Sequence, residues 1–526
     1  MRSFKWRVAL GVLALWGSAG LVAFPPTSGA QTSPATSAAT SAATTTQIGA
    51  YTTNDAWSYL SAPTLHPPKV TDSTTQPGRL AKGNFLVANF PNVVKPGPMD
   101  GQSGPLILDD HLQPVWFKPL PTSVVAMDLQ QETYKGRPVL TWWQGVISNT
   151  GSTLSGKVVV VDQHYKKVTA VVGQDGWVIS PHDAVITGND VWVTSYKTVP
   201  NVDLSTYGGA ANGSLYDFGV QEYDLASGKL RFTWDAYQHV PLSEAYQPPS
   251  PKATVPWDAY HGNSVQVIGK SQLLVSMRNT WAIYLVDTDT GDVVWTLGGK
   301  NSSFSMPANA KFEWQHDARL GKNGVLTAFD DNCCAIVGAG QFGTPGGPAK
   351  GLVLKLDTKA HRARLVHQYL HGADFDVAFT GSTQLLSNGN VLVGWGSQPY
   401  FSEYAKDGKL LLDASFPGKD LSYRALFSDS WVGKPDTLPS GAARKSHGKT
   451  TVYASWNGAT QVTGWRVLAG RDAGHLKTVA KSTKRGFETA VHLRHTYKVF
   501  KVQTLGAKGR VLRTSEAFMV PTPGFY

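Results

Sequence analysis

A short turn sequence recurs along this chain of 526 residues, and it limits the folds that the chain can adopt. In the three clearest copies an Asp stands four residues before a Gly or a His, and alternating apolar residues follow; these copies begin at Asp224, Asp287 and Asp357. Looser copies begin at Asp109, Asp162 and Tyr404. An Asp side chain accepts hydrogen bonds from turn amides and Gly adopts positive φ without strain, so each copy predicts a β-hairpin.

Together with the strands before them, the hairpins form six copies of one unit. The copies span residues 84–122, 124–178, 179–237, 258–300, 313–373 and 379–418. Units of this length are typical of four-stranded blades arranged around a central axis. The 53 Gly and 31 Pro also favour short strands joined by tight turns. We therefore expect an all-β chain with a six-bladed β-propeller over residues 48–430, with seven blades or an irregular closure as alternatives.

The pattern changes near the C-terminus. Residues 431–448 are rich in Pro, Gly and Ser and are expected to be a linker. Residues 449–526 then show short alternating strands, with Trp456 and Trp465 as expected core residues. This pattern predicts a small fibronectin/Ig-like β-sandwich with a structural or adhesive role.

The N-terminus has the features of an export signal. Arg2, Lys5 and Arg7 precede an apolar run over residues 8–24, and small residues at 27–30 offer a cleavage site. Residues 1–30 are therefore expected to be a signal peptide or an uncleaved membrane anchor, and residues 31–47, rich in Ser, Thr and Ala, a disordered linker. The protein is expected to be secreted or extracytoplasmic, with an uncleaved anchor as its only contact with a membrane.

Charge and cysteine content exclude several classes. The net charge is +11, but Lys and Arg are scattered without a dense run, so no nucleic-acid partner is expected. The only two cysteines, Cys333 and Cys334, are adjacent, which excludes a disulfide framework. A free pair, an intermolecular link and a vicinal disulfide all remain open for them.

Three histidines stand at the start of expected inner strands, namely His182, His261 and His316. In a propeller the inner strands line a central funnel, so equivalent positions of several blades meet around one axis. Arg278 and Arg319 accompany them, and a guanidinium offers paired donors to sulfate or phosphate. The alternative interpretation is that the histidines are hydrogen-bonded structural residues and the arginines form salt bridges.

Longer segments around these residues resemble the arylsulfotransferase family, specifically its ASST-like secreted branch. The strings that carry the resemblance are His261-Gly-Asn-Ser264, Met277-Arg-Asn-Thr280 and Trp314-Gln-His-Asp-Ala-Arg319, and similarity extends over roughly residues 80 to 425. The resemblance implies transfer of a sulfuryl group from a phenolic sulfate to a phenol through a sulfohistidine, with no nucleotide sulfate donor and no cofactor. Neutral imidazole is a suitable nucleophile for such a covalent step.

The resemblance also implies roles for individual residues. His261, His316 and His371 are the catalytic candidates, and His182, Asn263, Arg278 and Arg319 are expected to bind substrate. The nucleophile is expected from a late blade, yet residues 381–384 of the last copy contain no histidine. His371 is the nearest histidine in sequence; otherwise His316 serves, or turnover is absent.

Two other functions compete with the transferase. One is a non-catalytic propeller that binds a sulfated or otherwise anionic ligand at the cell surface. The other is a metal-dependent hydrolase, whose metal ligands would have to come from the pairs His182-Asp183 and His316-Asp317. Adjacent residues on a strand point to opposite faces, so neither pair chelates one ion without a bulge, and no metal site is expected.

Overall fold

A computed structural model describes residues 50–93, 97–148, 153–338, 341–342, 347–372, 375–418 and 420–521. The predicted signal and the linker up to residue 47 lie outside these residues. Within the described part, no helix is long and apolar enough to cross a membrane. This part of the chain consists of β-strands and the loops between them, with one short α-helix, α1 (Ala236–His239), and short 3₁₀ turns.

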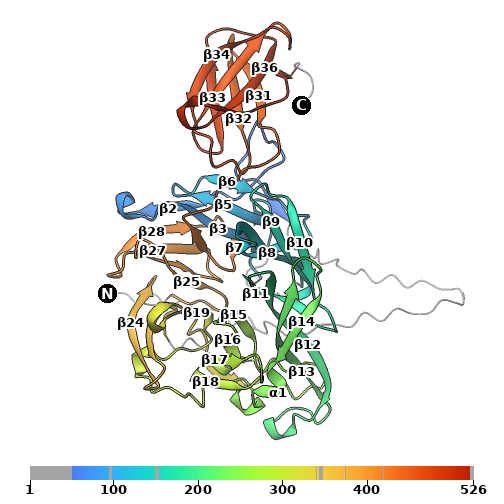
Figure 1. Cartoon of the computed structure of the whole chain (residues 1–526), viewed down its shortest axis with the longest axis vertical. Coiled ribbons are helices and arrows are strands. Elements are labelled where there is room, and N and C mark those ends of the chain that lie inside the picture. Colours follow the sequence, from blue (N-terminus) through green and yellow to red (C-terminus); the bar gives the residue numbers. More distant parts are fainter. Residues whose placement is uncertain are drawn as a thin grey trace, which may run out of the picture.

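Six antiparallel sheets, each of four or five strands, form the larger part of the molecule (Figure 1). The first contains β3 (Asn84–Pro91), β5 (Gly104–Asp109), β6 (Pro114–Phe117), β29 (Asp420–Ser422) and β30 (Leu426–Ser428). The second contains β7 (Val125–Tyr134), β8 (Arg137–Ile147), β9 (Thr153–Asp162) and β10 (Lys167–Val172). The third contains β11 (Val178–Thr187), β12 (Asp190–Val202), β13 (Gly213–Asp224) and β14 (Leu230–Asp235).

The other three sheets continue in chain order. The fourth contains β15 (Gly262–Ile268), β16 (Gln272–Met277), β17 (Ala282–Asp287) and β18 (Val293–Gly298), and the fifth β19 (His316–Leu320), β20 (Val325–Asp330), β23 (Lys350–Asp357) and β24 (Arg362–Leu370). The sixth contains β25 (Ser382–Leu385), β26 (Val391–Gly394), β27 (Tyr400–Tyr404) and β28 (Leu410–Ser415), with β2 (Thr71–Thr74) on its edge. Two short pairs, β1 (Tyr51–Thr52) with β4 (Met99–Asp100) and β21 (Ile336–Gly338) with β22 (Gln341–Phe342), lie apart from these sheets.

Each of the six predicted repeat units contains three or four strands of one of these sheets, and the predicted turn chemistry is confirmed. The Oδ1 atom of Asp287 accepts from the amides of Asp289 and Thr290, at 2.9 and 3.1 Å, and Asp357 accepts in the same way at its own turn. Gly291 closes its turn at a φ of 80°, a conformation that strains most other residues. The repeat that was visible in the sequence is therefore a repeat of hairpins capped by Asp.

The innermost strands contact one another in a ring, which gives the molecule its β-propeller-like form. In order, β7 contacts β11, β11 contacts β15, β15 contacts β19, β19 contacts β25, and β25 contacts β30. The ring closes because β29 and β30, from the end of the repeat region, pair with β3 from its start. Closure thus brings residues 420–428 into the middle of the molecule.

A Ser-x-Gln sequence ties neighbouring inner strands together at two places in the ring. Ser264 accepts from the amide of Ala318, and the Gln266 amide group both donates to and accepts from the backbone of Leu320. Ser382 and Gln384 repeat the arrangement on Ala425 and Phe427. Because these side chains satisfy backbone groups that no ladder pairs, they fix the register of one sheet against the next.

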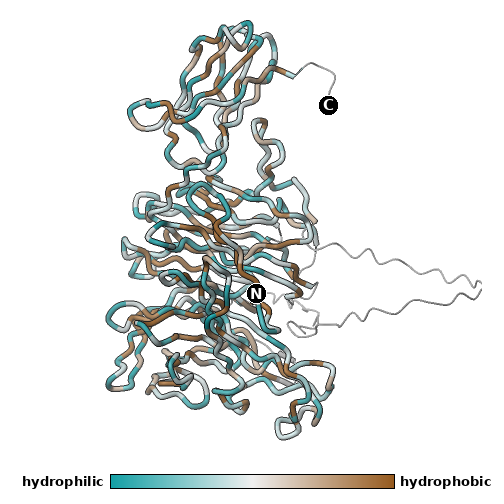
Figure 2. The backbone as a smooth tube through the Cα atoms, turned by 45° about the vertical axis from the view of Figure 1, so that its right-hand side comes forward, coloured by the Kyte–Doolittle hydropathy of each residue, from teal (hydrophilic) through white to brown (hydrophobic). Residues whose placement is uncertain are grey.

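The C-terminal part consists of two facing sheets around one apolar core that includes Trp465 and Phe500. One sheet contains β31 (Ser440–Ser446), β32 (Lys449–Ser455) and β35 (Glu488–Leu493); the other contains β33 (Gly464–Gly470), β34 (Leu476–Thr483), β36 (Val499–Leu505), β37 (Val511–Thr514) and β38 (Phe518–Met519). β31 lies within the range expected to be linker, because an edge strand with few apolar residues gives a weak pattern. Hydrophilic and hydrophobic positions alternate along the strands in both parts of the molecule (Figure 2).

Direct contacts join this sandwich to the first and second sheets (Figure 1). The Asn457 side chain donates to the carbonyl of Phe117 and accepts from its amide, and the Tyr165 hydroxyl donates to the carbonyl of Gly458. Glu488 accepts from the amide and hydroxyl of Ser61. The sandwich is therefore seated on the larger part through specific polar contacts.

Candidate functional site

A buried group of three carboxylates and two arginines lies where the inner strands meet, and we call it the ion cluster: Asp128, Asp183, Asp317, Arg319 and Arg424. Arg424 lies between β29 and β30. Its guanidinium is 2.9 Å from Asp128, 3.0 Å from Asp183 and 3.4 Å from Asp317, and it donates to the carbonyl of Asn263. One side chain therefore contacts residues of the second, third, fourth and fifth sheets.

Arg319 is fully occupied within the same cluster. It contacts both oxygens of Asp183 at 2.9 and 3.0 Å, reaches Asp317 at 3.0 Å, and donates to the carbonyl of Val265. Although burial alone would raise the pKa of Asp183, the adjacent guanidiniums of Arg319 and Arg424 lower it. From the sequence, Arg319 was expected to bind substrate. In the structure its guanidinium instead forms ion pairs with Asp183 and Asp317 and donates to the carbonyl of Val265.

Three histidines lie together beside the ion cluster, and these are the three that stood at strand starts. The rings of His182 and His261 are 5.0 Å apart between centroids. Tyr423 packs between the histidines, 5.6 Å from the His182 ring and 6.5 Å from the His316 ring. With Arg278 and Asp331, described next, we call His182, His261 and His316 the histidine cluster.

His316 is the most deeply buried of the three, and both of its ring nitrogens are oriented. Its Nδ1 lies 3.0 Å from Oδ2 of Asp331 as an ion-pair contact, outside hydrogen-bond alignment. Its Nε2 accepts from the backbone amide of Thr380 at 3.3 Å. In the neutral ring the lone pair is therefore on Nε2 and the proton on Nδ1, facing the carboxylate. The last repeat thus contributes the backbone amide of Thr380 to this site, whereas the family resemblance had implied a histidine from a late blade.

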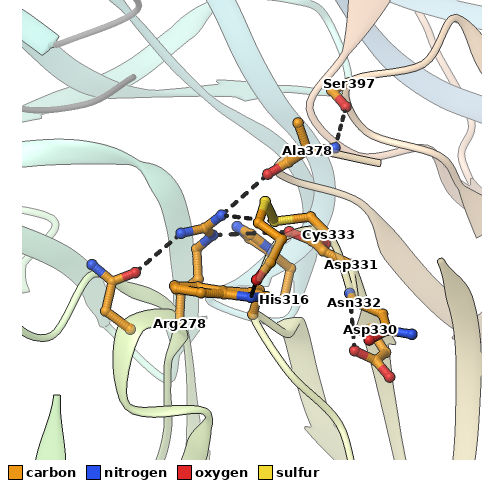
Figure 3. Close-up of a disulfide and its surroundings, with 11 residues drawn as sticks. Arg278, His316, Asp330, Asp331, Asn332, Cys333, Ala378 and Ser397 are labelled. Atoms are coloured by element: carbon orange, nitrogen blue, oxygen red, sulfur yellow. Dashed lines mark hydrogen bonds and ion pairs between the residues drawn. A yellow bond between two sulfur atoms is a disulfide. The ribbon is translucent and has the colours of Figure 1, made fainter. Parts of the chain in front are cut away.

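Arg278 has far weaker charge compensation than the arginines of the ion cluster (Figure 3). It donates to Asn279, to the carbonyl of Ala378 and to the sulfur of Cys333, and its guanidinium lies 4.5 Å from the centre of the Trp314 ring. The nearest carboxylate in the described part of the chain is Asp331, 3.9 Å from Nε. Burial lowers the pKa of Arg278, whereas the surrounding carboxylates outweigh burial and raise that of Arg424.

Burial also keeps two of the histidines neutral. It lowers the pKa of His316 well below the usual 6.5, and the nearby positive charge of Arg278 lowers it further. His182 is affected in the same direction by burial and by His261. His261 is more accessible, with 12% of its side chain exposed, and its Nδ1 contacts Asp258. The site thus combines buried neutral imidazoles with an imidazole closer to solvent.

The backbone around the two clusters adopts unusual conformations. Asp128, His261, Trp314, Asp317 and Thr380 all have positive φ, between 49° and 68°. Such angles are uncommon for residues other than Gly and are least favourable for a β-branched residue such as Thr. Strained backbone is concentrated at functional sites in proteins, where the surrounding packing holds it in place.

The remaining predicted residues are placed as follows. Asn263 is buried, donates to the carbonyl of Gln315, and lies between the two clusters. His371 lies elsewhere: its Nε2 is 3.1 Å from Asp413, and its ring packs against Phe375 and Tyr400. The structure therefore brings together six of the seven predicted residues and leaves His371 in a separate aromatic pocket.

Cys333 and Cys334 form a vicinal disulfide directly beside Arg278, which selects one of the three possibilities left open (Figure 3). Among the described residues, no group of three His, Cys, Asp or Glu side chains is arranged to hold a metal ion.

Sequence reasoning missed Asp331, Thr380, Tyr423 and Arg424. Asp331 could have been found from the sequence, because the Asp-Asp pair at 330–331 stands at the end of an expected strand. The other three stand outside the recurrent motifs, and only the closure of the ring brings Tyr423 and Arg424 to the centre.

Solved structures with similar arrangements have low sequence identity. A protein of unknown function from Bacteroides caccae is 12% identical, with 66% of this chain and 99% of that chain covered and a TM-score of 0.38. The Dos1 propeller is 11% identical, with 66% and 72% covered and a TM-score of 0.27. Kluyveromyces lactis Hsv2 is 8% identical, with 65% and 99% covered and a TM-score of 0.29.

Sequence comparison gives a clearer result. No curated protein matches the chain. A family model described as Arylsulfotransferase (ASST) matches residues 130–417, more than half of the chain, and this range contains both His261 and His316 with Arg278 between them. Each string that resembled this family contributes one residue to the histidine cluster, namely His261, Arg278 and His316, and the chain belongs to the arylsulfotransferase (ASST) family.

Proposed function

We propose that this protein is an exported aryl-sulfate sulfotransferase, which moves a sulfuryl group from an aryl sulfate to a phenol through a histidine intermediate and without a nucleotide sulfate donor. The observation that carries the proposal is Arg278, a buried arginine without a carboxylate at hydrogen-bond distance among the described residues. A buried guanidinium in this state is stabilised by an anion, and a sulfate group offers oxygens with matching geometry. The neutral histidines beside it supply the nucleophile.

His316 is the best candidate for the nucleophile. Its Nε2 carries the lone pair. Burial raises the pKa of Asp331 well above its usual range and the Arg278 guanidinium opposes this shift; in its ionised form, Asp331 at Nδ1 would stabilise the positive charge that develops on the ring during attack. The depressed pKa keeps the ring unprotonated at neutral pH. The Thr380 amide, now at Nε2, is placed to donate to a sulfuryl oxygen once the nitrogen has reacted.

His261 suits the proton transfers, since it is the more accessible histidine and Asp258 orients it. In the first half-reaction, Nε2 of His316 attacks sulfur, the bond between sulfur and the phenolic oxygen breaks, and the phenolate takes a proton from His261. In the second half-reaction, the acceptor phenol loses its proton to His261 as its oxygen attacks sulfur. The bond between nitrogen and sulfur then breaks, which regenerates both histidines.

The proposal extends to architecture and location. The six sheets are proposed to be the blades of a closed propeller, and the C-terminal sandwich to be a fibronectin/Ig-like domain. Export is supported by the basic and apolar pattern of residues 1–30, with an uncleaved anchor as the alternative. A transferase that needs no soluble nucleotide donor is compatible with a location outside the cytoplasm.

The test is the release of 4-nitrophenolate from 4-nitrophenyl sulfate by the purified protein, with and without added phenol. We expect phenol to accelerate release, and intact-mass spectrometry without acceptor to show one added sulfuryl group. His316→Ala should lose both the adduct and turnover, whereas the control variant His371→Ala, from a partly buried His–Asp pair outside the cluster, should keep them.

Two results would contradict parts of the proposal. If His316→Ala still forms the adduct, the nucleophile is another histidine. If the wild-type protein binds 4-nitrophenyl sulfate but neither releases nitrophenolate nor forms an adduct, the histidine cluster is an anion-binding site, as in the non-catalytic alternative.

A further inference from the structure

The net positive charge of this protein comes from the sandwich. Residues 440–521 contain 15 Lys and Arg and 3 Asp and Glu, a net charge of +12, whereas the other 444 residues contain 33 and 34, a net charge of −1. No dense basic run is visible in the sequence, and the contrast in net charge emerges only when the two domains are counted separately. A basic domain seated on a neutral one attracts anionic partners to itself.

The outer face of the sheet β31–β32–β35 collects part of this charge. Along these strands Ala443, Val452 and Val491 point into the core, so the alternate residues point outward. Cross-strand pairing places Arg444 opposite Thr451, and Thr451 opposite His492. Lys449 and Arg494 continue the same face toward the hairpin end of the sheet. We call this outward set, with Tyr453, the basic face: Arg444, Lys449, Tyr453, His492 and Arg494.

Carboxylates are absent from the segments that carry Arg444, Lys449 and Arg494, because residues 440–451 and 490–499 contain no Asp or Glu. Glu488, at the other end of β35 on the same face, accepts from the amide and hydroxyl of Ser61. Within the described residues of the sandwich, the only ion pairs are those of Asp472 with Arg471 and His475, in the turn between β33 and β34. Like charges close together without counter-charges reduce stability, and an external anion bound to this face would relieve that repulsion.

Tyr453 gives the face a second property. Its cross-strand neighbours are Ala442 on one side and Ala490 on the other, so small side chains flank a half-buried ring. A flat aromatic surface between small residues can stack against the apolar face of a sugar ring. In the opposite sheet the outward positions Arg466, Lys481 and Lys501 are also basic, but Leu468 takes the place of an aromatic residue.

We propose that the basic face binds an acidic polysaccharide, with Tyr453 stacking on a sugar ring and Arg444, Lys449 and Arg494 pairing with its carboxylate or sulfate groups. An anionic membrane is the less favoured partner, because Val511 and Met519 are the only exposed large apolar side chains among the described residues of the sandwich. This inference is independent of sulfuryl transfer, since the histidine cluster lies in the other part of the molecule.

The experiment measures binding of the full-length protein to polygalacturonate and to dextran sulfate at physiological salt, with uncharged dextran as the reference. We expect binding to both acidic polymers and none to dextran. The triple variant R444Q/K449Q/R494Q should bind about 30-fold more weakly, in keeping with loss of several ionic contacts. The matched variant R466Q/K481Q/K501Q removes the same charge from the opposite sheet and should bind within about threefold of wild type.

Tyr453→Ala provides a test that does not depend on charge. We expect it to weaken polygalacturonate binding about fivefold, within the range of aromatic stacking contributions, while elution from a plain cation-exchange resin stays unchanged. The proposal is overturned if the two triple variants weaken binding equally, since the field of the whole domain would then suffice. It is also overturned if anionic phospholipid vesicles or single-stranded DNA bind more tightly than either polysaccharide. Release of nitrophenolate should be unchanged in all three variants.

Discussion

Two buried arginines lie in adjacent parts of this molecule and differ in what surrounds them. Arg424 has three carboxylates within 3.4 Å, whereas Arg278 has a single one at 3.9 Å. Accordingly the pKa of Arg424 is raised and that of Arg278 is lowered. A buried charge that the protein compensates itself stabilises a fold, and one left undercompensated is prepared for a ligand of opposite charge.

The location of each arginine explains its role. Arg424 comes from the segment that closes the ring of sheets, so its bonds to several sheets hold the closure in place. Arg278 comes from a turn at the end of β16, beside Trp314, the vicinal disulfide and His316. The ion cluster is therefore a structural centre, and the histidine cluster is the site available for chemistry.

Removing the compensated arginine should have the greater effect on stability. We expect Arg424→Gln to lower the free energy of unfolding of the larger part by about 3–5 kcal/mol, because it leaves buried carboxylates without their partner. Differential scanning calorimetry measures this. Arg278→Gln is the control and should change stability by less than about 1 kcal/mol; equal losses would show that the two sites do not differ in kind.

For activity, we expect the substitution of Arg278 to have the larger effect. Arg278→Gln should lower kcat/KM for 4-nitrophenyl sulfate by about 10²–10³-fold, equivalent to about 3–4 kcal/mol, since the guanidinium would stabilise charge on the sulfuryl oxygens in the transition state. Arg278→Lys should recover only part of this loss, because an ammonium lacks paired planar donors. Steady-state kinetics measures kcat/KM for both variants, and a fully active Arg278→Lys would argue against a contact made through two donors.

Ligand binding should distinguish Arg278 from Arg319. With an aryl sulfate present at about 100 times its Kd, the free energy of unfolding should rise by about 2.7 kcal/mol through binding to the folded state. Arg278→Gln should remove most of this increment at the same ligand concentration. Arg319→Gln should retain it, even from a lower starting stability, because Arg319 is saturated by Asp183 and Asp317. Loss of the increment in Arg319→Gln would instead place that residue at the ligand.

The pH dependence of activity should be the smallest of these effects. A histidine with the ordinary pKa of about 6.5 would be about tenfold less available as a neutral nucleophile at pH 5.5 than at high pH. Because burial and Arg278 lower the pKa of His316, its neutral form persists to lower pH, and kcat/KM should fall by less than about threefold down to pH 5.5. In Arg278→Gln the acid limb should move to higher pH; an unmoved limb would mean that another group controls it.

Much of the fold was accessible from the sequence because its information is local. An Asp that accepts turn amides and a Gly at positive φ act within a few residues, so the hairpins at Asp224, Asp287 and Asp357 could be located without coordinates. The same holds for His182, His261 and His316, which stand at equivalent positions of repeated strands.

The sequence was least informative where a residue's surroundings depend on distant parts of the chain. His371 is near the expected position in sequence, yet it lies in an aromatic pocket beside Asp413. Arg319 looked as suitable for an anion as Arg278, because the two differ only in which carboxylates the fold places beside them.

The amino-acid sequence by itself determined the β-hairpin repeat, the histidines near the start of its inner strands and the basic character of the last 80 or so residues. Ring closure then selected which of these groups meet, by bringing Tyr423 and Arg424 beside residues up to 296 positions away. The physical reason is that hairpin turns depend on short-range backbone geometry, whereas compensation of a buried charge depends on every carboxylate within a few ångströms, whatever its distance along the chain.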